Sequence, residues 1–471
     1  MIMKRFCMLA ALSAVLIYGC SPKNPVLTVE GGQVQGVKTG EVYSYKGIPF
    51  AAAPIGDLRW KEPQPVTPWE GVKVADHFSA AAPQTPHDAA NPYTSEFFFD
   101  GDPEFSEDCL YLNVWTKAPG KTSKKLPVAM WIHGGGYTAG WGFEPEMEGT
   151  EWAKKDVVLV TINYRLGVFG FLNHPFLTAE SGHNSSGNYG ILDQIAALKW
   201  VYNNIAQFGG DPDNITIFGQ SAGAGSVKTL VNSPLTGNLI KKAIIQSGGG
   251  ASQNPAPVNP NLTSAGEIAK TVFDWAGYDT LDKMRAASTE EVFNLAARYA
   301  TETGQNVRLS SSPSADGYLM TESFDSAANG GRIKDIPYMI GYTMNDMRAM
   351  DESIGYFCEL REKAGKPAYA YEFARPLPDD AAGSHKMKGA FHSSELWYTF
   401  KSLANSDRPF TQDDYLLAER IIGCWTSFVK TGKPGNGWEP YTSANPKFMV
   451  FKLDASGEDE SAMGDPIISL D

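Results

Sequence analysis

Apolar residues in this chain gather in short runs without polar alternation. Such runs occupy residues 128–132, 157–162, 215–218 and 243–245. A strand buried on both faces has this pattern, whereas a strand with one solvent-exposed face alternates apolar and polar residues. Upstream, residues 26–37 predict a β-hairpin that turns at two consecutive glycines.

Segments with apolar residues at helical spacing separate the runs. Residues 190–205 have this spacing, and so do residues 411–430, which begin with the capping residue Thr411. Alternating buried strands and amphipathic helices predict an α/β fold with a mostly parallel central sheet flanked by helices. No linker or repeat interrupts the pattern, so we expect one domain over residues 20–471.

One apolar run leads into a pentapeptide with catalytic character. Residues 219–223 read Gly-Gln-Ser-Ala-Gly and are followed by a segment with helical spacing. In a strand, turn and helix context, the G-x-S-x-G pattern is typical of a nucleophile elbow, whose glycines permit a strained turn that exposes the serine. An ordinary glycine-rich turn is the alternative. We take Ser221 as the candidate nucleophile.

A second glycine loop follows the run at 128–132. Residues 133–136 read His-Gly-Gly-Gly, the signature of esterases and lipases whose loop amides help to form an oxyanion hole. Attack on an ester carbonyl places negative charge on the carbonyl oxygen. Backbone amides that are already oriented toward this oxygen, in a site that excludes water, stabilise the charge. The candidate donors are the amides of Gly135, Gly136 and Ala222.

Chain order restricts the choice of histidine. In α/β-hydrolases the nucleophile precedes the acid, and the acid precedes the histidine. Only His385 and His392 follow Ser221. His385 lies in a polar stretch, whereas His392 lies among apolar and small residues that would hold its ring in one orientation. We therefore predict His392 as the catalytic base, with a structural core histidine as the alternative.

The acid is predicted from its place after a strand. Residues 336–341 form an apolar run, and Asp346 follows it in a loop, the position where such enzymes carry their acid. The main rival, Asp316, lies in a Ser-Ala-Asp-Gly stretch that is more typical of a turn aspartate.

Further blocks extend over nearly all of the chain. They are Tyr-Lys-Gly-Ile-Pro-Phe-Ala at 45–51, Leu-Arg-Trp at 58–60, residues 106–115 and 163–167, Gly-Asn-Tyr-Gly-Ile-Leu-Asp-Gln at 187–194, and Phe-Gly-Gly-Asp-Pro at 208–212. With these blocks the chain resembles the type-B carboxylesterases, which include bacterial para-nitrobenzyl esterases, animal carboxylesterases and cholinesterases. The resemblance implies an α/β-hydrolase fold, the triad Ser221, Asp346 and His392, and an oxyanion hole at Gly135, Gly136 and Ala222.

The chain departs from the family pattern at several positions. The acid is Asp346 rather than the usual glutamate, and the elbow carries Gln220 where glutamate is common. Cys109 is expected to be a free thiol because the partner position in relatives is Ala82 here. The interval from Asp346 to His392 is short for the family, which predicts a reduced helical cap and an open active-site mouth.

The resemblance also assigns charged residues to structure rather than to catalysis. The family pairs arginines and acids within these blocks, and buried pairs of this kind specify packing. We expect structural ion pairs among Arg59, Arg165, Glu107, Asp108 and Asp193.

Composition limits the other possibilities. Hydrophobic residues form 42% of the chain, enough for a deep core, and the net charge of −13 without a basic cluster argues against a nucleic-acid partner. The sequence contains no metalloprotease, paired C-x-x-C or phosphate-loop motif. We therefore expect no cofactor and no metal.

The N-terminal residues predict export. Lys4 and Arg5 precede a short apolar segment at 8–18, which is too brief to span a bilayer, and Gly19 precedes Cys20. This pattern resembles a bacterial lipoprotein signal over residues 1–19, cleaved before a lipidated Cys20. The expected location is the cell envelope, periplasm or outer membrane, with plain secretion as the alternative.

Together these features predict a serine carboxylic-ester hydrolase that acts through an acyl-enzyme on small-molecule esters. Two alternatives remain from the sequence. The first is a non-catalytic binding protein with this fold, which the intact Ser221, Asp346 and His392 oppose. The second is cholinesterase-like specificity, which is weakly supported because the loop at 91–105 contains aromatic residues but no tryptophan for a choline head group.

Overall fold

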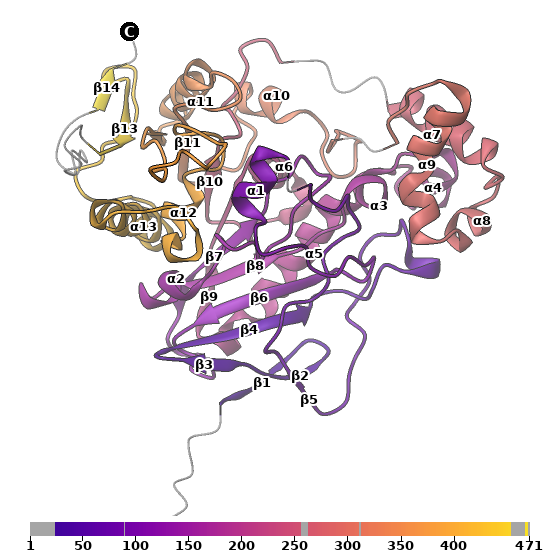
Figure 1. Cartoon of the computed structure of the whole chain (residues 1–471), viewed down its shortest axis with the longest axis horizontal. Coiled ribbons are helices and arrows are strands. Elements are labelled where there is room, and N and C mark those ends of the chain that lie inside the picture. The colour runs from indigo at the N-terminus through magenta and orange to yellow at the C-terminus, as the bar shows by residue number, and fades with distance from the viewer. Residues whose placement is uncertain (1–23, 89, 256–261, 310–311, 454–466, 470–471) are drawn as a thin grey trace, which may run out of the picture.

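The computed structural model describes residues 24–88, 90–255, 262–309, 312–453 and 467–469. A central sheet of 11 strands runs through the molecule in the order β14-β13-β12-β11-β10-β9-β7-β8-β6-β4-β3. From β13 to β8 neighbouring strands are parallel, and the strands at both edges pair in antiparallel fashion. The predicted α/β fold with a mostly parallel sheet is confirmed (Figure 1).

The strands of the central sheet are β3 (Val37–Thr39), β4 (Val42–Pro49), β6 (Tyr111–Thr116), β7 (Leu126–Ile132), β8 (Val158–Ile162), β9 (Gly210–Gln220), β10 (Lys242–Gln246), β11 (Tyr338–Thr343), β12 (Tyr369–Phe373), β13 (Lys447–Phe451) and β14 (Ile467–Ser469). The four apolar runs lie within or overlap β7, β8, β9 and β10, all at the centre of this sheet. A smaller sheet contains β1 (Val26–Val29), β2 (Gly32–Gln35) and β5 (Val72–Val74). Its first two strands form the predicted N-terminal hairpin.

The helices are α1 (Pro92–Phe97), α2 (Thr150–Lys154), α3 (Gly167–Phe171), α4 (Pro175–Glu180), α5 (Tyr189–Asn204), α6 (Ala222–Asn232), α7 (Leu262–Trp275), α8 (Leu281–Ala286), α9 (Thr289–Thr303), α10 (Phe324–Asn329), α11 (Asp351–Lys363), α12 (Leu396–Thr399) and α13 (Gln412–Thr431). Short 3₁₀ turns occupy Gly56–Leu58, Ile205–Phe208, Pro234–Thr236 and Leu403–Asn405. Both predicted helices are present. The side chain of Thr411 caps α13 in a capping box with Asp414, and Gly432 ends it at a φ of 77°.

The central strands are buried on both faces, as their lack of polar alternation predicts. Along β7, Val128 and Met130 pack into a core that includes α5 and α6, whereas Ala129 and Trp131 pack into a second core that includes α13. Each face of the sheet is therefore covered by helices, and the two cores alternate along one strand.

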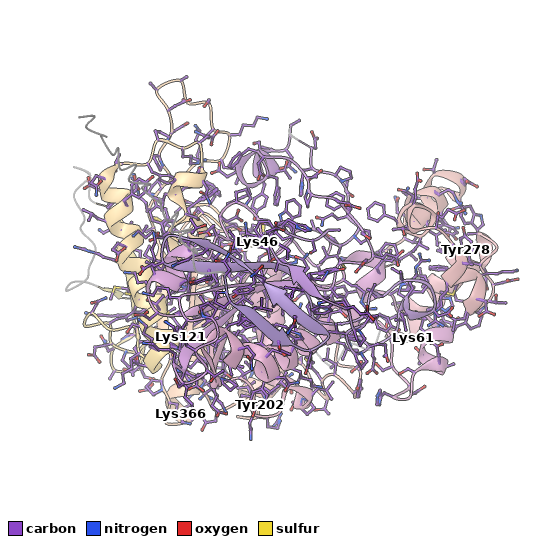
Figure 2. All side chains as sticks on the ribbon, turned by 90° about the horizontal axis from the view of Figure 1, so that it is seen from below. Lys46, Lys61, Lys121, Tyr202, Tyr278 and Lys366 are labelled. Atoms are coloured by element: carbon purple, nitrogen blue, oxygen red, sulfur yellow. The ribbon has the colours of Figure 1, made fainter. Side chains whose placement is uncertain are left out.

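A separate group of helices lies beside the sheet. Helices α4, α7, α8 and α9 form a lobe at the right of Figure 1, and Figure 2 shows Lys61 and Tyr278 on the same lobe. Its core centres on Trp60, Phe273 and Leu295. Within the described part of the chain, no helix is both long and apolar enough to cross a membrane.

The structure tests the expected ion pairs. Arg59 and Glu107 form a bidentate pair at 2.6 and 2.7 Å, and Arg165 binds Asp193 at 2.7 and 2.8 Å. Asp108 is different: the described residues give it no ion pair, and its partner is the hydroxyl of Tyr111. Assigning Asp108 to an arginine pair was therefore wrong, because its half-buried carboxylate finds a neutral donor nearby.

The cysteine prediction is confirmed. Cys109 is a free, fully buried thiol, and Ala82 is itself buried in the same core. Cys358 and Cys424 are also buried and form no disulfide within the described residues, and Cys424 accepts a hydrogen bond from the side chain of Asn436. Burial raises the pKa of the Cys109 thiol well above its usual value, so the group is inert rather than nucleophilic.

Candidate active site

Ser221 occupies a strained turn between β9 and α6. Its φ of 58° and ψ of −121° lie outside the regions that a residue with a side chain favours. Two backbone hydrogen bonds hold the turn: Ser221 N–H donates to Gln246 O at 2.9 Å, and Gly225 N–H donates to Ser221 O at 3.0 Å. The sequence pattern for a nucleophile elbow thus corresponds to the expected strand, turn and helix.

The glycines on either side of Ser221 are needed for close backbone contacts. A Cβ on Gly219 would lie 2.6 Å from the carbonyl carbon of Gly223, and one on Gly223 would lie 2.1 Å from Ile132 O. Both distances are shorter than any normal contact. The elbow therefore packs directly against the end of β7, which leads into the second glycine loop.

That loop places backbone amides beside the elbow. Gly135 and Gly136 have φ values of 94° and 62°, which glycine adopts without strain. Among the described residues, none accepts a hydrogen bond from the N–H of Gly135, Gly136 or Ala222. A Cβ on Gly134 would lie 3.2 Å from Cβ of Ser221, so the loop and the serine are in contact. Donors without partners next to a nucleophile have the arrangement of an oxyanion hole.

His133 fixes the start of the oxyanion loop. Its ring is fully buried, stacks on Tyr164 at 4.4 Å, and lies 2.9 Å through Nδ1 from Gly134 O. Burial lowers its pKa to about 4, so the ring is neutral at physiological pH. The tyrosine hydroxyl in turn donates to His133 O at 2.9 Å. This histidine supports the loop, and in the described residues it has no hydrogen bond to Ser221, His392 or Asp346.

His392 and Asp346 are hydrogen-bonded to each other. Nδ1 of the ring lies 2.7 Å from Oδ1 of the carboxylate, and both side chains are at least nine-tenths buried. Burial alone would raise the pKa of Asp346, but the hydrogen bond and charge of His392 outweigh burial and hold that pKa below its usual value. The carboxylate is therefore ionised and can orient the imidazole through Nδ1.

The two loops are joined directly, which explains how a short acid reaches the ring. Asn345 N–H donates to Ala390 O at 2.9 Å, and Ala390 N–H donates back to Oδ1 of Asn345 at 3.0 Å. The residues that precede Asp346 and His392 thus run side by side. Aspartate is sufficient here because the backbone itself is drawn close.

Gln220 contacts the same imidazole. Its side-chain nitrogen lies 3.1 Å from Nε2 of His392, the ring nitrogen that would accept the proton of Ser221. In the part of the chain that the structure describes, Ser221 Oγ has no hydrogen bond to His392. The sequence marked Gln220 only as a departure from the family, and gave no sign of this contact.

The rival residues lie elsewhere. Asp316 accepts hydrogen bonds from the backbone N–H of Tyr318 and Leu319 and from the side chain of Asn188, as a turn aspartate does. His385 lies 3.9 Å from Asp407 in a surface loop. Neither is part of the site, so the structure brings together the residues that chain order and strand position selected.

Three buried acids near the site were missed by sequence reasoning. Glu395 follows His392 by one helical turn, and burial with the nearby charge of Asp346 raises its pKa to about 8. Glu144 and Glu146 interact behind the oxyanion loop, where Glu144 accepts from Trp141 N–H at 3.0 Å. Burial raises the pKa of Glu144 to about 7 and that of Glu146 well above its usual value. Glutamate is commonly exposed, so only the folded chain reveals these positions.

The described residues contain no group of three histidine, cysteine or acidic side chains that could hold a metal ion. The site consists of a serine in a strained turn, a histidine and carboxylate pair, and free backbone amides. Such a site on a parallel α/β sheet defines a serine hydrolase of the α/β-hydrolase fold.

Comparison with known proteins gives the family. The model of the "Carboxylesterase family" matches residues 23–355 and 352–463. The fumonisin B1 esterase of Sphingopyxis macrogoltabida is 37% identical over 432 residues, with 90% of this chain and 74% of that protein covered. The para-nitrobenzyl esterase of Bacillus subtilis (strain 168) is 32% identical over 487 residues, with 92% and 96% covered.

Solved structures agree with the sequence comparison. A thermophilic para-nitrobenzyl esterase superposes with a TM-score of 0.77 at 28% identity, with 93% of this chain and 97% of that chain covered. A carboxylesterase of Geobacillus stearothermophilus gives a TM-score of 0.73 at 30% identity, with 91% and 96% covered. The chain belongs to the carboxylesterase family and is a serine carboxylic-ester hydrolase.

Proposed function

We propose that Ser221, His392 and Asp346 are the catalytic triad of this esterase, with the amides of Gly135, Gly136 and Ala222 as the oxyanion hole. The observation that carries the proposal is the 2.7 Å hydrogen bond between His392 and Asp346. These residues are far apart in sequence, yet they meet in the order that this fold requires.

The reaction proceeds through an acyl-enzyme. Oγ of Ser221 attacks the ester carbonyl while Nε2 of His392 takes its proton, and the tetrahedral oxyanion accepts hydrogen bonds from the three amides. The imidazolium, stabilised by Asp346, then gives the proton to the departing alcohol. Water repeats the sequence on the acyl-enzyme and releases the acid. For the first step Nε2 must exchange its contact with Gln220 for one with Ser221.

Substitution of each member tests the triad. Ser221→Ala and His392→Ala should lower kcat by several orders of magnitude, to the residual rate of about 10³-fold to 10⁴-fold over water that binding and the oxyanion hole supply. Asp346→Asn should also be severe because the ring loses its orienting acceptor. His385→Ala is the matched control and should keep full activity. Near wild-type hydrolysis of 4-nitrophenyl acetate by Ser221→Ala would refute the assignment.

For the substrate, we propose small or medium acyl esters of bulky or aryl alcohols. Met344 and Met347 lie close to Asp346 in sequence and are 58% and 75% exposed, which favours an open apolar rim over a closed gorge. The family match also divides at residues 352–355, between the acid and the histidine. The name of the para-nitrobenzyl esterase relative favours an aryl alcohol group.

A graded ester series tests this substrate class. We expect kcat/KM to fall little between methyl and naphthyl acetates, and hydrolysis of long-chain triglycerides to be weak. A steep fall with the size of the alcohol would show a closed mouth, whereas negligible rates on every ester would show that the short interval before His392 damages the triad.

We further propose that lipid on Cys20 anchors the enzyme in the bacterial cell envelope. Residues 1–23, including the signal segment at 1–19, lie outside the described residues, so the proposal rests on the sequence pattern. Intact-mass analysis should find a diacylglyceryl group that Cys20→Ser lacks; an unmodified mature N-terminus would refute the anchor.

A further inference from the structure

Two neighbouring cavities lead away from the elbow along α6. One has a volume of about 330 Å³ and is lined by Tyr137, Gly225 and Lys228. The other has a volume of about 510 Å³ and is lined by Lys228, Gly249 and Arg348. They share Lys228 as a wall residue, so they are adjacent parts of one hollow.

The hollow lies next to the oxyanion loop and the first turn of α6, although neither cavity is lined by Ser221 or His392. Tyr137 directly follows Gly136 of the oxyanion loop, and Gly225 N–H donates to Ser221 O at 3.0 Å. At the other end, Arg348 lies two positions after Asp346 in sequence. Lys228 is seven residues from Ser221, which corresponds to about 10 Å along a helix. A substrate bound at the serine could therefore extend into this space.

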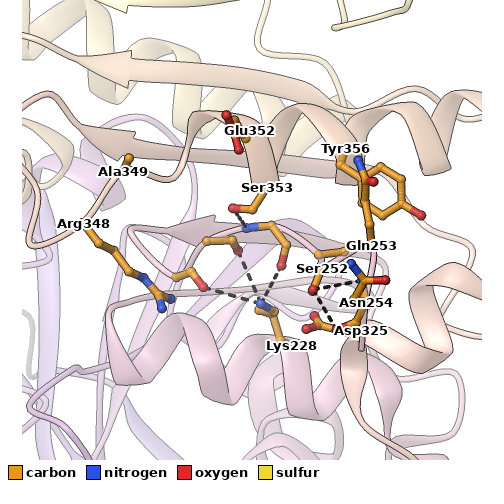
Figure 3. Close-up of a pocket in the computed structure, with 14 residues that line it drawn as sticks. Lys228, Ser252, Gln253, Asn254, Asp325, Arg348, Ala349, Glu352, Ser353 and Tyr356 are labelled. Carbon is orange, nitrogen blue, oxygen red and sulfur yellow. Dashed lines mark hydrogen bonds between the residues drawn. The ribbon is translucent and has the colours of Figure 1, made fainter. Parts of the chain in front are cut away.

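Lys228 brings a positive charge into the hollow (Figure 3). Its ammonium donates to Gly250 O at 2.7 Å and to Gly248 O and Gly249 O at 3.5 Å each. Burial lowers its pKa to about 8, while the charge of Asp325 acts in the opposite direction. The ammonium remains mostly protonated at neutral pH, and its nearest carboxylate partly offsets it.

Arg348 supplies a second charge that no carboxylate neutralises. Its side chain reaches into the same cavity in Figure 3, and Nη2 lies 3.4 Å from the place where a Cβ of Gly249 would be. Arg348 is exposed, and within the described ranges it forms no ion pair and no hydrogen bond, although the carboxylates of Asp325 and Glu352 line the same cavity. A guanidinium keeps five donors in a planar fork that matches a carboxylate.

The wall between these cations is rigid. Gly250 N–H donates to Oγ of Ser353 at 3.1 Å, and Ala251 N–H donates to Ser353 O at 3.0 Å. A Cβ on Gly250 would lie only 1.9 Å from Ser353 O, so the loop after β10 is pressed against α11. Packed backbone therefore fixes the loop between the two cations, and side chains such as Asn254, Glu352 and Tyr356 complete the cavity wall.

We propose that this hollow binds a free carboxylate carried by the ester substrate, with Arg348 as its hydrogen-bond donor and Lys228 as a second positive charge. The inference rests on the proposed triad, because it places the substrate carbonyl at Ser221. It deepens the substrate class from neutral esters to esters of dicarboxylic acids or of hydroxy acids. The distance along α6 requires several bonds between the ester and the carboxylate.

Matched substrate pairs test the proposal. The first pair is the 4-methylumbelliferyl monoester of adipic acid and the same ester with a terminal carboxamide. The second pair carries the carboxylate or carboxamide on the alcohol, as acetates of 3-(4-hydroxyphenyl)propionate and its amide. We expect the wild type to prefer the carboxylate within one pair by about 10-fold or more in kcat/KM, and that pair identifies the acyl or the alcohol side.

Substitutions of the two cations test which residue causes the preference for the carboxylate substrate. Arg348→Gln should lower the carboxylate to carboxamide ratio by about 10-fold to 100-fold, mainly through KM, and added salt should weaken the wild-type ratio. Arg332→Gln removes an exposed arginine that pairs with Glu322 and should leave the ratio unchanged. Lys228→Met should lower the ratio less, and its thermal unfolding should be checked because the ammonium also holds three carbonyls.

Two results would overturn the proposal: a wild-type ratio near one in both pairs, or equal proportional losses on carboxylate and carboxamide in Arg348→Gln, which leave its ratio equal to that of the wild type. The last would make Arg348 a support for the loop of Asp346. If the wild type hydrolyses neither carboxamide ester nor 4-nitrophenyl acetate, the proposed triad fails instead. Competitive inhibition by adipate, but not by adipamide, gives an independent measure of the site.

Discussion

Buried acids occur in two regions of this molecule and are held in opposite ways. Away from the active site, Glu107 is bound by Nε and Nη2 of Arg59, and Asp193 is bound by Nε and Nη2 of Arg165. Around the active site, Glu395 is equally buried at 1% exposure, but neither of its carboxyl oxygens has a hydrogen bond of normal geometry, although Gln246 lies near.

The acids behind the oxyanion loop resemble Glu395, because they too are buried without an arginine partner. Glu144 and Glu146 face each other without a cation, and Oε2 of Glu146 has no partner among the described residues. A buried carboxylate without a counter-charge is costly, so the group keeps its proton to a higher pH. The paired acids are thus fixed charges that hold the packing, whereas Glu395, Glu144 and Glu146 change their charge as the pH changes.

The largest effect should come from breaking a paired acid. Asp193→Asn leaves the fully buried guanidinium of Arg165 without its counter-charge, and we expect the free energy of unfolding to fall by about 3 to 5 kcal/mol. Urea unfolding at pH 7 measures this loss. Glu322→Gln is the control, since it removes an ion pair whose arginine is 56% exposed, and should cost less than about 1 kcal/mol. Equal costs would remove the distinction between buried and exposed pairs.

The fold was accessible from the sequence because it depends on local patterns, whereas the paired acids were accessible only through the resemblance to the family. The runs at 128–132 and 215–218 lack polar residues, and their strands β7 and β9 are buried on both faces. The elbow was accessible for the same reason, since its glycines are demanded by contacts within the turn and with β7. The misassigned Asp108 shows the limit: its neighbour was chosen by side-chain geometry that sequence spacing does not contain.

The remainder of the site depends on contacts between distant segments. Gln220 reaches His392 across 172 positions of sequence, and Tyr93 O–H lies 2.7 Å from Ser393 Oγ across 300. No periodicity links such residues. The unpaired acids were missed because a glutamate near a motif is ordinarily exposed, and only the packing of α1, α12 and the oxyanion loop buries them.

A second prediction concerns the pH dependence of stability. The folded chain keeps the proton of Glu395 up to about pH 8, whereas the unfolded chain releases it near the usual value of 4.5. The native state therefore binds more protons in this window, so stability falls as pH rises through it and is fully retained only below it. Glu395→Gln should reduce the loss between pH 5 and pH 8 by about 1 to 3 kcal/mol.

Urea unfolding of the wild type and Glu395→Gln at four pH values between 5 and 8 measures this difference. Glu290→Gln, at an exposed position on α9, should follow the wild-type curve. Parallel curves for the wild type and Glu395→Gln would show that Glu395 is ionised in the folded state and has found a partner, which would place it with the paired acids.

The smallest expected effect concerns the pair behind the oxyanion loop. Glu146→Gln keeps the shape of the side chain and removes a carboxyl group whose pKa is raised on folding, so the stability loss between pH 4.5 and about 7 should shrink by about 1 kcal/mol. Because Glu144 accepts from Trp141 N–H next to the oxyanion loop, the variant should also lose less esterase activity than the wild type on moving from pH 7 to pH 9.

Glu148→Gln, two positions further along, is the control, since its carboxylate accepts from Thr150 N–H and an amide oxygen can do the same. If Glu146→Gln and Glu148→Gln give the same unfolding curves, the two facing acids do not share a proton, and the contrast between the two kinds of buried acid is confined to Glu395.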